Sequence, residues 1–211
     1  MTVHPGSWLA AETGVVIVEE PEGLAAIRRP DVAAAIWHRQ PLRAFQRWID
    51  TLDPALLPSA RLILRPADVR DAVTQLCDGA GMPDCASRVR LIDDVAALAD
   101  LFGHVMRAPY LRLRLDVVTG NACRKFHVDS VTARLVCTYR GQGTQYGVSH
   151  DGSDPARVVT VATGSPMLLR GTAWPGTAPA GLVHRSPPIE GTGETRLLLV
   201  LDPVHEPEDE A

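Results

Sequence analysis

Hydrophobic residues recur at two different spacings along the chain, and the spacing changes near residue 107. Before that point, alanine and leucine recur every three or four residues, as on the buried face of a helix. After it, short runs rich in valine, threonine and glycine follow the two-residue period of strands. We therefore expect an α+β protein in which a helical N-terminal half packs on a C-terminal β core.

The region 1–107 is expected to be mainly helical, with one short strand at 15–19. Pro30 separates the first two helical patterns, because proline ends a helix. The predicted helices are 24–27, 31–38, 42–52, 67–77 and 88–106.

The region 108–204 is expected to form the β core. Within 110–116, leucines at 111, 113 and 115 alternate with polar residues, which predicts a half-buried strand. Glycine and proline separate the other predicted strands, which are 126–139, 158–162, 167–170, 182–184 and 195–201. Many short strands without helices between them favour an antiparallel sandwich or barrel. The jelly roll, also called the double-stranded β-helix, is such a fold. The acidic segment 205–211 is predicted to be a solvated tail, and the whole chain to be one structural unit.

Composition limits the partners. The chain has 211 residues and a formal net charge of −4, which argues against a nucleic-acid backbone or an anionic membrane surface as its main partner. No apolar run is long enough to span a membrane, and residues 1–10 lack the pattern of a signal peptide. We therefore expect a cytoplasmic protein, and the sequence specifies neither its substrate nor its oligomeric state.

Four cysteines, at positions 77, 85, 123 and 137, form no C-x-x-C pair. This spacing excludes a zinc ribbon and a thioredoxin motif, so we expect buried thiols. One alternative stays open: Cys123 lies four residues before His127 and could join it and Asp129 in a zinc site. The glycines of 141–147 are read as a turn, because no helix follows them as a dinucleotide-binding loop requires.

A candidate metal site begins with His127 and Asp129, which lie two residues apart. On a strand, this spacing puts both side chains on the same face. His184, on a later predicted strand, would add a second imidazole. Two histidines and one carboxylate can bind one face of non-haem iron and leave three positions open. The alternative is that His184 is structural, packed beside Pro187 and Pro188.

Arg196 is the third unusual feature. It lies in the run 195–201, whose two faces are both apolar, so the strand is expected to be covered on both sides. A buried guanidinium destabilises the fold unless an anion pairs with it. The partner is expected to be Glu194, Asp202 or an anionic ligand.

His127-Val128-Asp129, the distal His184 and Arg196 together resemble the iron(II)- and 2-oxoglutarate-dependent oxygenases, which have a jelly-roll core. The resemblance covers roughly 110–203. It implies that the two histidines and Asp129 bind Fe(II), and that Arg196 binds the distal carboxylate of 2-oxoglutarate. In this family, oxidative decarboxylation of 2-oxoglutarate to succinate and carbon dioxide is coupled to oxidation of a substrate C–H bond.

The same resemblance gives Tyr139 or Thr138 as a second donor to 2-oxoglutarate. One position departs from the family, because many members have serine or threonine two residues after the arginine, where this chain has Leu198. The segments 126–129, 141–144 and 183–188 also resemble a bacterial family of unknown function.

Two other functions remain open from the sequence. The first is a cupin-type metalloprotein that binds zinc, manganese or iron and catalyses a different reaction. The second is a non-catalytic metal-binding module in which Arg196 pairs internally. The oxygenase differs from the cupin-type protein in that Arg196 should face an empty, ligand-sized pocket beside the metal. Convergence of His127, Asp129 and His184 separates both from the non-catalytic module.

Overall fold

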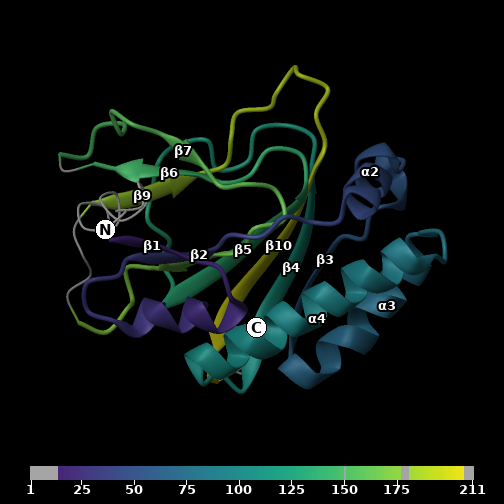
Figure 1. Cartoon of the computed structure of the whole chain (residues 1–211), viewed down its shortest axis with the longest axis horizontal. Coiled ribbons are helices and arrows are strands. Elements are labelled where there is room, and N and C mark those ends of the chain that lie inside the picture. Colours follow the sequence, from purple (N-terminus) through teal and green to yellow (C-terminus); the bar gives the residue numbers. More distant parts are fainter. Residues whose placement is uncertain (1–13, 150, 177–180, 207–211) are drawn as a thin grey trace, which may run out of the picture.

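Two β-sheets and a layer of helices make up the part of the chain that the structure describes, residues 14–149, 151–176 and 181–206. The structure is a computed structural model (Figure 1). The larger sheet has seven strands in the order β1-β2-β8-β5-β10-β4-β3, and the smaller has three in the order β7-β6-β9. All neighbouring strands are antiparallel except β1 and β2.

The strands of the larger sheet are β1 (Val15–Val18), β2 (Ala34–Trp37), β3 (Ala60–Leu64), β4 (Tyr110–Val118), β5 (Ala133–Arg140), β8 (Met167–Arg170) and β10 (Arg196–Val204). Those of the smaller sheet are β6 (Gln145–Val148), β7 (Val159–Thr160) and β9 (Leu182–Arg185). The α-helices are α2 (Arg43–Thr51), α3 (Val69–Gly79) and α4 (Ala86–Met106). Three 3-10 helices are η1 (Pro21–Arg28), η2 (Pro54–Leu56) and η3 (Pro66–Asp68).

The larger sheet lies between the helices and the smaller sheet. Helices α3 and α4 cover one of its faces, and the smaller sheet lies over the other (Figure 1). Among the described residues, no helix is both long enough and apolar enough to cross a membrane.

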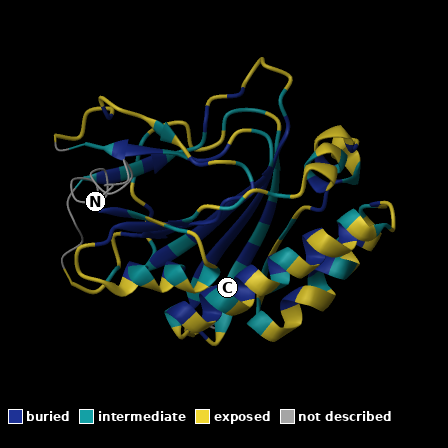
Figure 2. Cartoon of the chain, viewed as in Figure 1, coloured by how far each residue is buried: buried dark blue, intermediate teal, exposed yellow. Residues whose placement is uncertain are grey.

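Strand alternation builds a core on each face of the larger sheet. On β10, Leu197, Leu199 and Leu201 face the helices, whereas Leu198 and Val200 face the smaller sheet. Nearly every residue of β10 is buried, and the central strands are dark blue in Figure 2. The expectation that this strand is covered on both sides is therefore confirmed. We call the face that carries Leu198 and Val200 the inner face.

The predicted antiparallel β core and the helices over 42–52, 67–77 and 88–106 are confirmed by the corresponding elements. The helix predicted over 31–38 is wrong, because Ala34–Trp37 forms strand β2 between β1 and β8. Every residue of the run 32–36 is buried. A continuous apolar run shows neither the helical nor the strand period, so the sequence pattern does not distinguish a helix from a strand here. Strands β3 and β6 were not predicted from the sequence. Strands β1, β2 and β3 all come from the region expected to be mainly helical, so this region helps to build the large sheet.

Candidate metal centre

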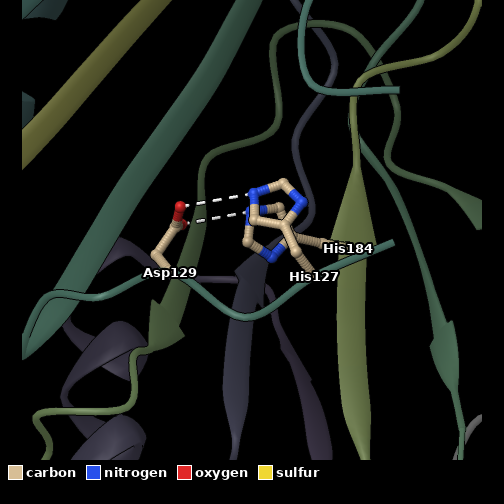
Figure 3. Close-up of side chains that lie close together, drawn as sticks. All are labelled: His127, Asp129 and His184. Carbon is tan, nitrogen blue, oxygen red and sulfur yellow. Dashed lines mark ion pairs between the residues drawn. The ribbon is translucent and has the colours of Figure 1, made fainter. Parts of the chain in front are cut away.

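His127, Asp129 and His184 meet at one point beside the inner face (Figure 3). One potential ligand atom from each lies within 4.8 Å of the others. The Nε2 atom of His127 is 3.4 Å from Asp129 Oδ1, and that of His184 is 3.1 Å from Asp129 Oδ2. The structure therefore brings together the three residues that the sequence singled out as metal ligands.

The backbone, rather than one continuous strand, fixes this arrangement. The prediction of a strand over 126–139 is wrong in its first half, because β5 begins only at Ala133. His127 instead forms an isolated β-bridge with His184, which lies on β9. The loop after Asp129 is held by the turn that follows β8, where Thr172 N–H donates to the Asp129 carbonyl at 2.8 Å.

Gly171 explains why this loop can pack so closely on the end of β8. A Cβ atom at position 171 would lie 1.9 Å from the Val131 carbonyl oxygen and 2.7 Å from that of Asp129. Both neighbours are backbone atoms, which cannot move aside without moving the loop. The absence of a side chain at Gly171 therefore helps to place Asp129.

The hydrogen bond of His127 selects its tautomer. Its Nδ1 lies 2.9 Å from the Lys125 carbonyl oxygen. Because a carbonyl only accepts, Nδ1 carries a proton, and in the neutral ring the lone pair is on Nε2. The Nε2 atom is the one that faces Asp129, so the ring is oriented as a metal-binding imidazole commonly is.

Only one carboxylate oxygen of Asp129 accepts a well-formed hydrogen bond from a described side chain. Arg134 Nη1 donates to its Oδ1, whereas its Oδ2 is buried and lies 3.1 Å from His184 Nε2 without a well-formed hydrogen bond to any described residue. The Nε and Nη2 of Arg134 also donate to both oxygens of Asp202, at 2.7 and 2.8 Å. A buried carboxylate oxygen without a donor is costly, and a cation at this point would satisfy it.

The surroundings keep Asp129 ionised. Burial acts to raise the pKa of this carboxyl, but contact with His184 and the charges of Arg134 and His127 outweigh it. The pKa falls to about 2 from an ordinary value of 3.8. Asp129 is therefore available as an anionic ligand at neutral pH.

A pocket of about 120 Å³ adjoins the two histidines. Its apolar wall includes Val118, Val136, Leu198 and Val200 of the larger sheet. Three arginines also line it, namely Arg114, Arg134 and Arg185. The site is therefore lined by apolar strand residues and by positive charge.

Arg185 supports the segment that carries His127. Its guanidinium lies over the ring of Phe126, 4.3 Å from the centroid, and its Nε donates to Gln145 Oε1 at 2.8 Å. Because Phe126 directly precedes His127, this stacking links the ligand-bearing segment to β6 and β9.

Arg196 is fully buried, and alternation along β10 places it on the inner face with Leu198 and Val200, although it is not among the residues that line the pocket beside the histidines. Its Nε donates to the Gln142 carbonyl oxygen at 2.7 Å, while Nη1 and Nη2 have no hydrogen-bond partner among the described residues. Burial lowers the pKa of Arg196 to about 10, although the charge of Glu194 acts to raise it. The guanidinium thus remains without the anion that burial calls for.

Neither acid considered as an internal partner forms a hydrogen bond with Arg196. Glu194 accepts from the backbone N–H and the side-chain amide of Gln142, at 2.7 and 2.9 Å. Asp202 is bound to Arg134 at the other end of β10. Of the three partners named from the sequence, the anionic ligand remains.

The two candidate second donors lie on opposite faces of β5. Tyr139 is buried among the residues that face the helices, and its hydroxyl donates to Asp94 Oδ2 at 2.7 Å. This position disagrees with a role beside Arg196, and it follows from alternation along β5, because Leu135 and Cys137 face the helices as well. Thr138 is also buried, and it pairs with Leu198 in the register of β5 and β10.

The cysteines are divided by exposure. Cys77 and Cys137 are buried as expected, whereas Cys123 is exposed and lines the pocket, so the expectation of a buried thiol is wrong there. The group that can hold a metal in the described part of the chain consists of His127, Asp129 and His184, without a cysteine.

The roles of Arg114 and Arg134 were not predicted from the sequence. Arg114 lies on the polar face of β4, which was read as facing solvent but faces the pocket. Arg134 binds both Asp129 and Asp202. The alternation of arginine with leucine in β4 was the available signal, and only the second sheet reveals what that face meets.

The fold is similar to that of two solved dioxygenases. One similar solved structure is the Arabidopsis thaliana dioxygenase for auxin oxidation 1 in complex with 2-oxoglutarate, with a TM-score of 0.51 and 11% identity. The match covers 91% of this chain and 92% of that one. The rice dioxygenase for auxin oxidation matches with a TM-score of 0.50 and 14% identity over 90% of this chain and 82% of that one.

The chain belongs to the family described as protein of unknown function DUF1826, whose model matches residues 18–202. This agrees with the resemblance to a family of unknown function noted in the sequence. No curated protein matches the chain.

Proposed function

We propose that this protein is an iron(II)- and 2-oxoglutarate-dependent oxygenase. The observation that carries the proposal is a His-Asp-His group beside a sheet face that also holds a buried arginine without an anionic partner. A metal site alone would suit many metalloproteins. The additional guanidinium favours an enzyme whose metal works with an anionic co-substrate.

The residues present fit iron(II). His127, Asp129 and His184 supply two imidazoles and one carboxylate, the set that binds one face of non-haem iron. The buried Oδ2 of Asp129 forms no well-formed hydrogen bond with a described residue and faces His184 Nε2, so a cation could bind between the two atoms. Arg134 holds the other oxygen, which favours a single Asp129 oxygen as the ligand.

Arg196 would bind the distal carboxylate of 2-oxoglutarate. Its planar guanidinium presents Nη1 and Nη2 together, which suits a bidentate contact with a carboxylate. The contact with Gln142 fixes the Nε side of the fork and leaves these two atoms for the ligand. Thr138 stays a candidate for a second donor, because it lies on the inner face opposite Leu198.

Iron with bound 2-oxoglutarate would supply the oxidative decarboxylation that is coupled to oxidation of a substrate C–H bond. The chain's own residues have three tasks. The two histidines and Asp129 occupy one side of the metal, Arg196 orients the co-substrate, and Arg134 keeps Asp129 in position. Val136, Leu198 and Val200 provide an apolar wall that limits water near the site.

Titration with 2-oxoglutarate under anaerobic iron(II) tests this proposal. The wild type should develop the metal-to-ligand absorption band of a chelated keto acid. Arg196→Met keeps much of the side-chain packing but removes the fork, so it should retain metal yet bind 2-oxoglutarate more than about tenfold more weakly. Arg61→Met, at an exposed position on β3, is the matched control and should behave as the wild type.

Equal affinity in the Arg196→Met and wild-type proteins would contradict the role of Arg196. Absence of the band in a wild-type protein that binds iron would contradict the oxygenase and favour the cupin-type metalloprotein.

A further inference from the structure

Arg114 is a second arginine in the pocket whose hydrogen-bonding capacity is unmet. Its side chain is 17% exposed, and it lines the same pocket as His127 and His184. Its Nε is buried and has no hydrogen-bond partner among the described residues. A guanidinium so placed is costly unless an anion reaches it.

The neighbouring acids do not form hydrogen bonds with the guanidinium of Arg114. Asp202 Oδ2 is 3.7 Å from Arg114 Nη2, and Asp116 Oδ2 is 4.0 Å from Nη1, both beyond hydrogen-bond distance. Asp202 already accepts two hydrogen bonds from Arg134. Asp116 is 41% exposed, so water weakens its attraction.

The positive charge of Arg134 further destabilises the charged form of Arg114. Burial first, and then the charge of Arg134, lower the pKa of Arg114, and the two aspartates only partly oppose them. A dication at His127, Asp129 and His184 would add positive charge to the same pocket. The pocket therefore favours an anion at Arg114.

We propose that Arg114 binds a carboxylate of the substrate, and that the substrate is a small organic acid. The inference rests on the proposed oxygenase function, in which Arg196 is occupied by 2-oxoglutarate. The hydrocarbon part of the acid packs on Val136, Leu198 and Val200, which line the pocket around Arg114. This contact would hold the acid close to the two histidines.

The strand register separates the two arginines. Arg114 on β4 pairs with Val200, whereas Arg196 on β10 pairs with Val118. These two pairs are four residues apart on the same strands, or about 13 Å at the rise of a β-strand. The backbones of the two arginines are therefore well separated on the inner face. This separation suits the binding of two different carboxylates, one by each guanidinium.

Nuclear magnetic resonance of isotope-labelled arginine side chains tests the inference. The protein is loaded with Zn(II), which is diamagnetic, and saturated with 2-oxoglutarate. Butyrate is the probe, and butyramide is its uncharged control of similar shape. The Nε–H signals of the two arginines are assigned from their loss in Arg114→Met and Arg196→Met.

Butyrate should shift the Arg114 signal along a saturating curve, and butyramide should leave it unchanged. 2-Oxoglutarate alone should shift the Arg196 signal. Absence of a saturating butyrate shift, or an Arg114 signal already moved to its end point by 2-oxoglutarate, would overturn the substrate role of Arg114. Failure of 2-oxoglutarate to move Arg196 would instead contradict the proposed function, while the butyrate titration still reports on Arg114.

A second measurement does not depend on the choice of probe. Under anaerobic iron(II), Arg114→Met should bind 2-oxoglutarate within about twofold of the wild-type affinity, because Arg196 is intact. A loss of more than tenfold, equal to that of Arg196→Met, would assign Arg114 to the co-substrate and overturn the inference.

Discussion

The backbones of His127 and His184 exchange two hydrogen bonds, with each N–H donating to the carbonyl of the other at 3.0 Å. Their rings lie 4.6 Å apart between centroids. Since main-chain atoms set the separation, the site does not depend on the side chains to hold the two segments together. The metal-binding group is therefore largely organised before a metal arrives.

Replacement of either imidazole should remove the metal while leaving the fold. His127→Ala and His184→Ala each delete one ligand but keep the backbone bridge. We expect each to weaken Co(II) binding by more than about 100-fold, beyond the usual effect of residues that only support a ligand. Calorimetric titration measures the affinity, and circular dichroism checks the fold. Wild-type affinity in either variant would contradict the assignment of that histidine.

Arg134 should act on metal affinity through Asp129. Arg134→Met removes the donor to Asp129 Oδ1 and frees the carboxylate to rotate. We expect Co(II) affinity to fall by about 10- to 100-fold, with Arg61→Met unchanged. The Co(II) visible spectrum should also change, because the orientation of the carboxylate is altered. If neither affinity nor spectrum moves, Arg134 supports only the fold.

The pH dependence of the metal-free protein should report on Asp129. Its pKa in the folded state is about 2, below the ordinary 3.8, so its ionisation stabilises the fold above about pH 4. This contribution, about 2 kcal/mol, is lost as the pH falls through 2. Urea unfolding between pH 5 and pH 2 should show a correspondingly steeper loss of stability in the wild type than in Asp129→Asn. If the free energy of unfolding depends on pH in the same way in the two proteins, the stabilisation assigned to Asp129 is contradicted.

Gly171→Ala should disturb the site without touching a ligand. The added methyl group would meet the backbone at Val131 and Asp129, so the loop must shift. We expect metal affinity to fall at least about tenfold, comparable to loss of a supporting residue. Gly120→Ala, where a Cβ meets nothing within 4 Å, is the control. Equal affinities in the two variants would show that the loop adjusts freely.

Much of the site could be predicted because its chemistry is unusual for its surroundings. His127, Asp129 and His184 stood out by residue type and spacing, and Arg196 stood out as a charge in an apolar strand. These predictions rest on residue type and spacing, so they do not depend on the conformation of the intervening loops. His127 was predicted on a strand and lies in a bridge, yet the expected group still forms.

Other structural features depend on contacts with segments that are distant in the sequence, which local sequence patterns do not reveal. The polar face of β4 looked like a solvent face, but Arg114 lies in the pocket. Ala34–Trp37 became a strand because β1 and β8 pair with it, which overrides the helical preference of alanine.

The release of carbon dioxide from 2-oxoglutarate is the most direct test of the central claim. 2-Oxoglutarate labelled at its first carbon is supplied with iron(II), oxygen and ascorbate. We expect labelled carbon dioxide and an equal amount of succinate from the wild type, and neither above background from His184→Ala. Wild-type protein that binds iron but releases no more carbon dioxide than His184→Ala would contradict the proposal.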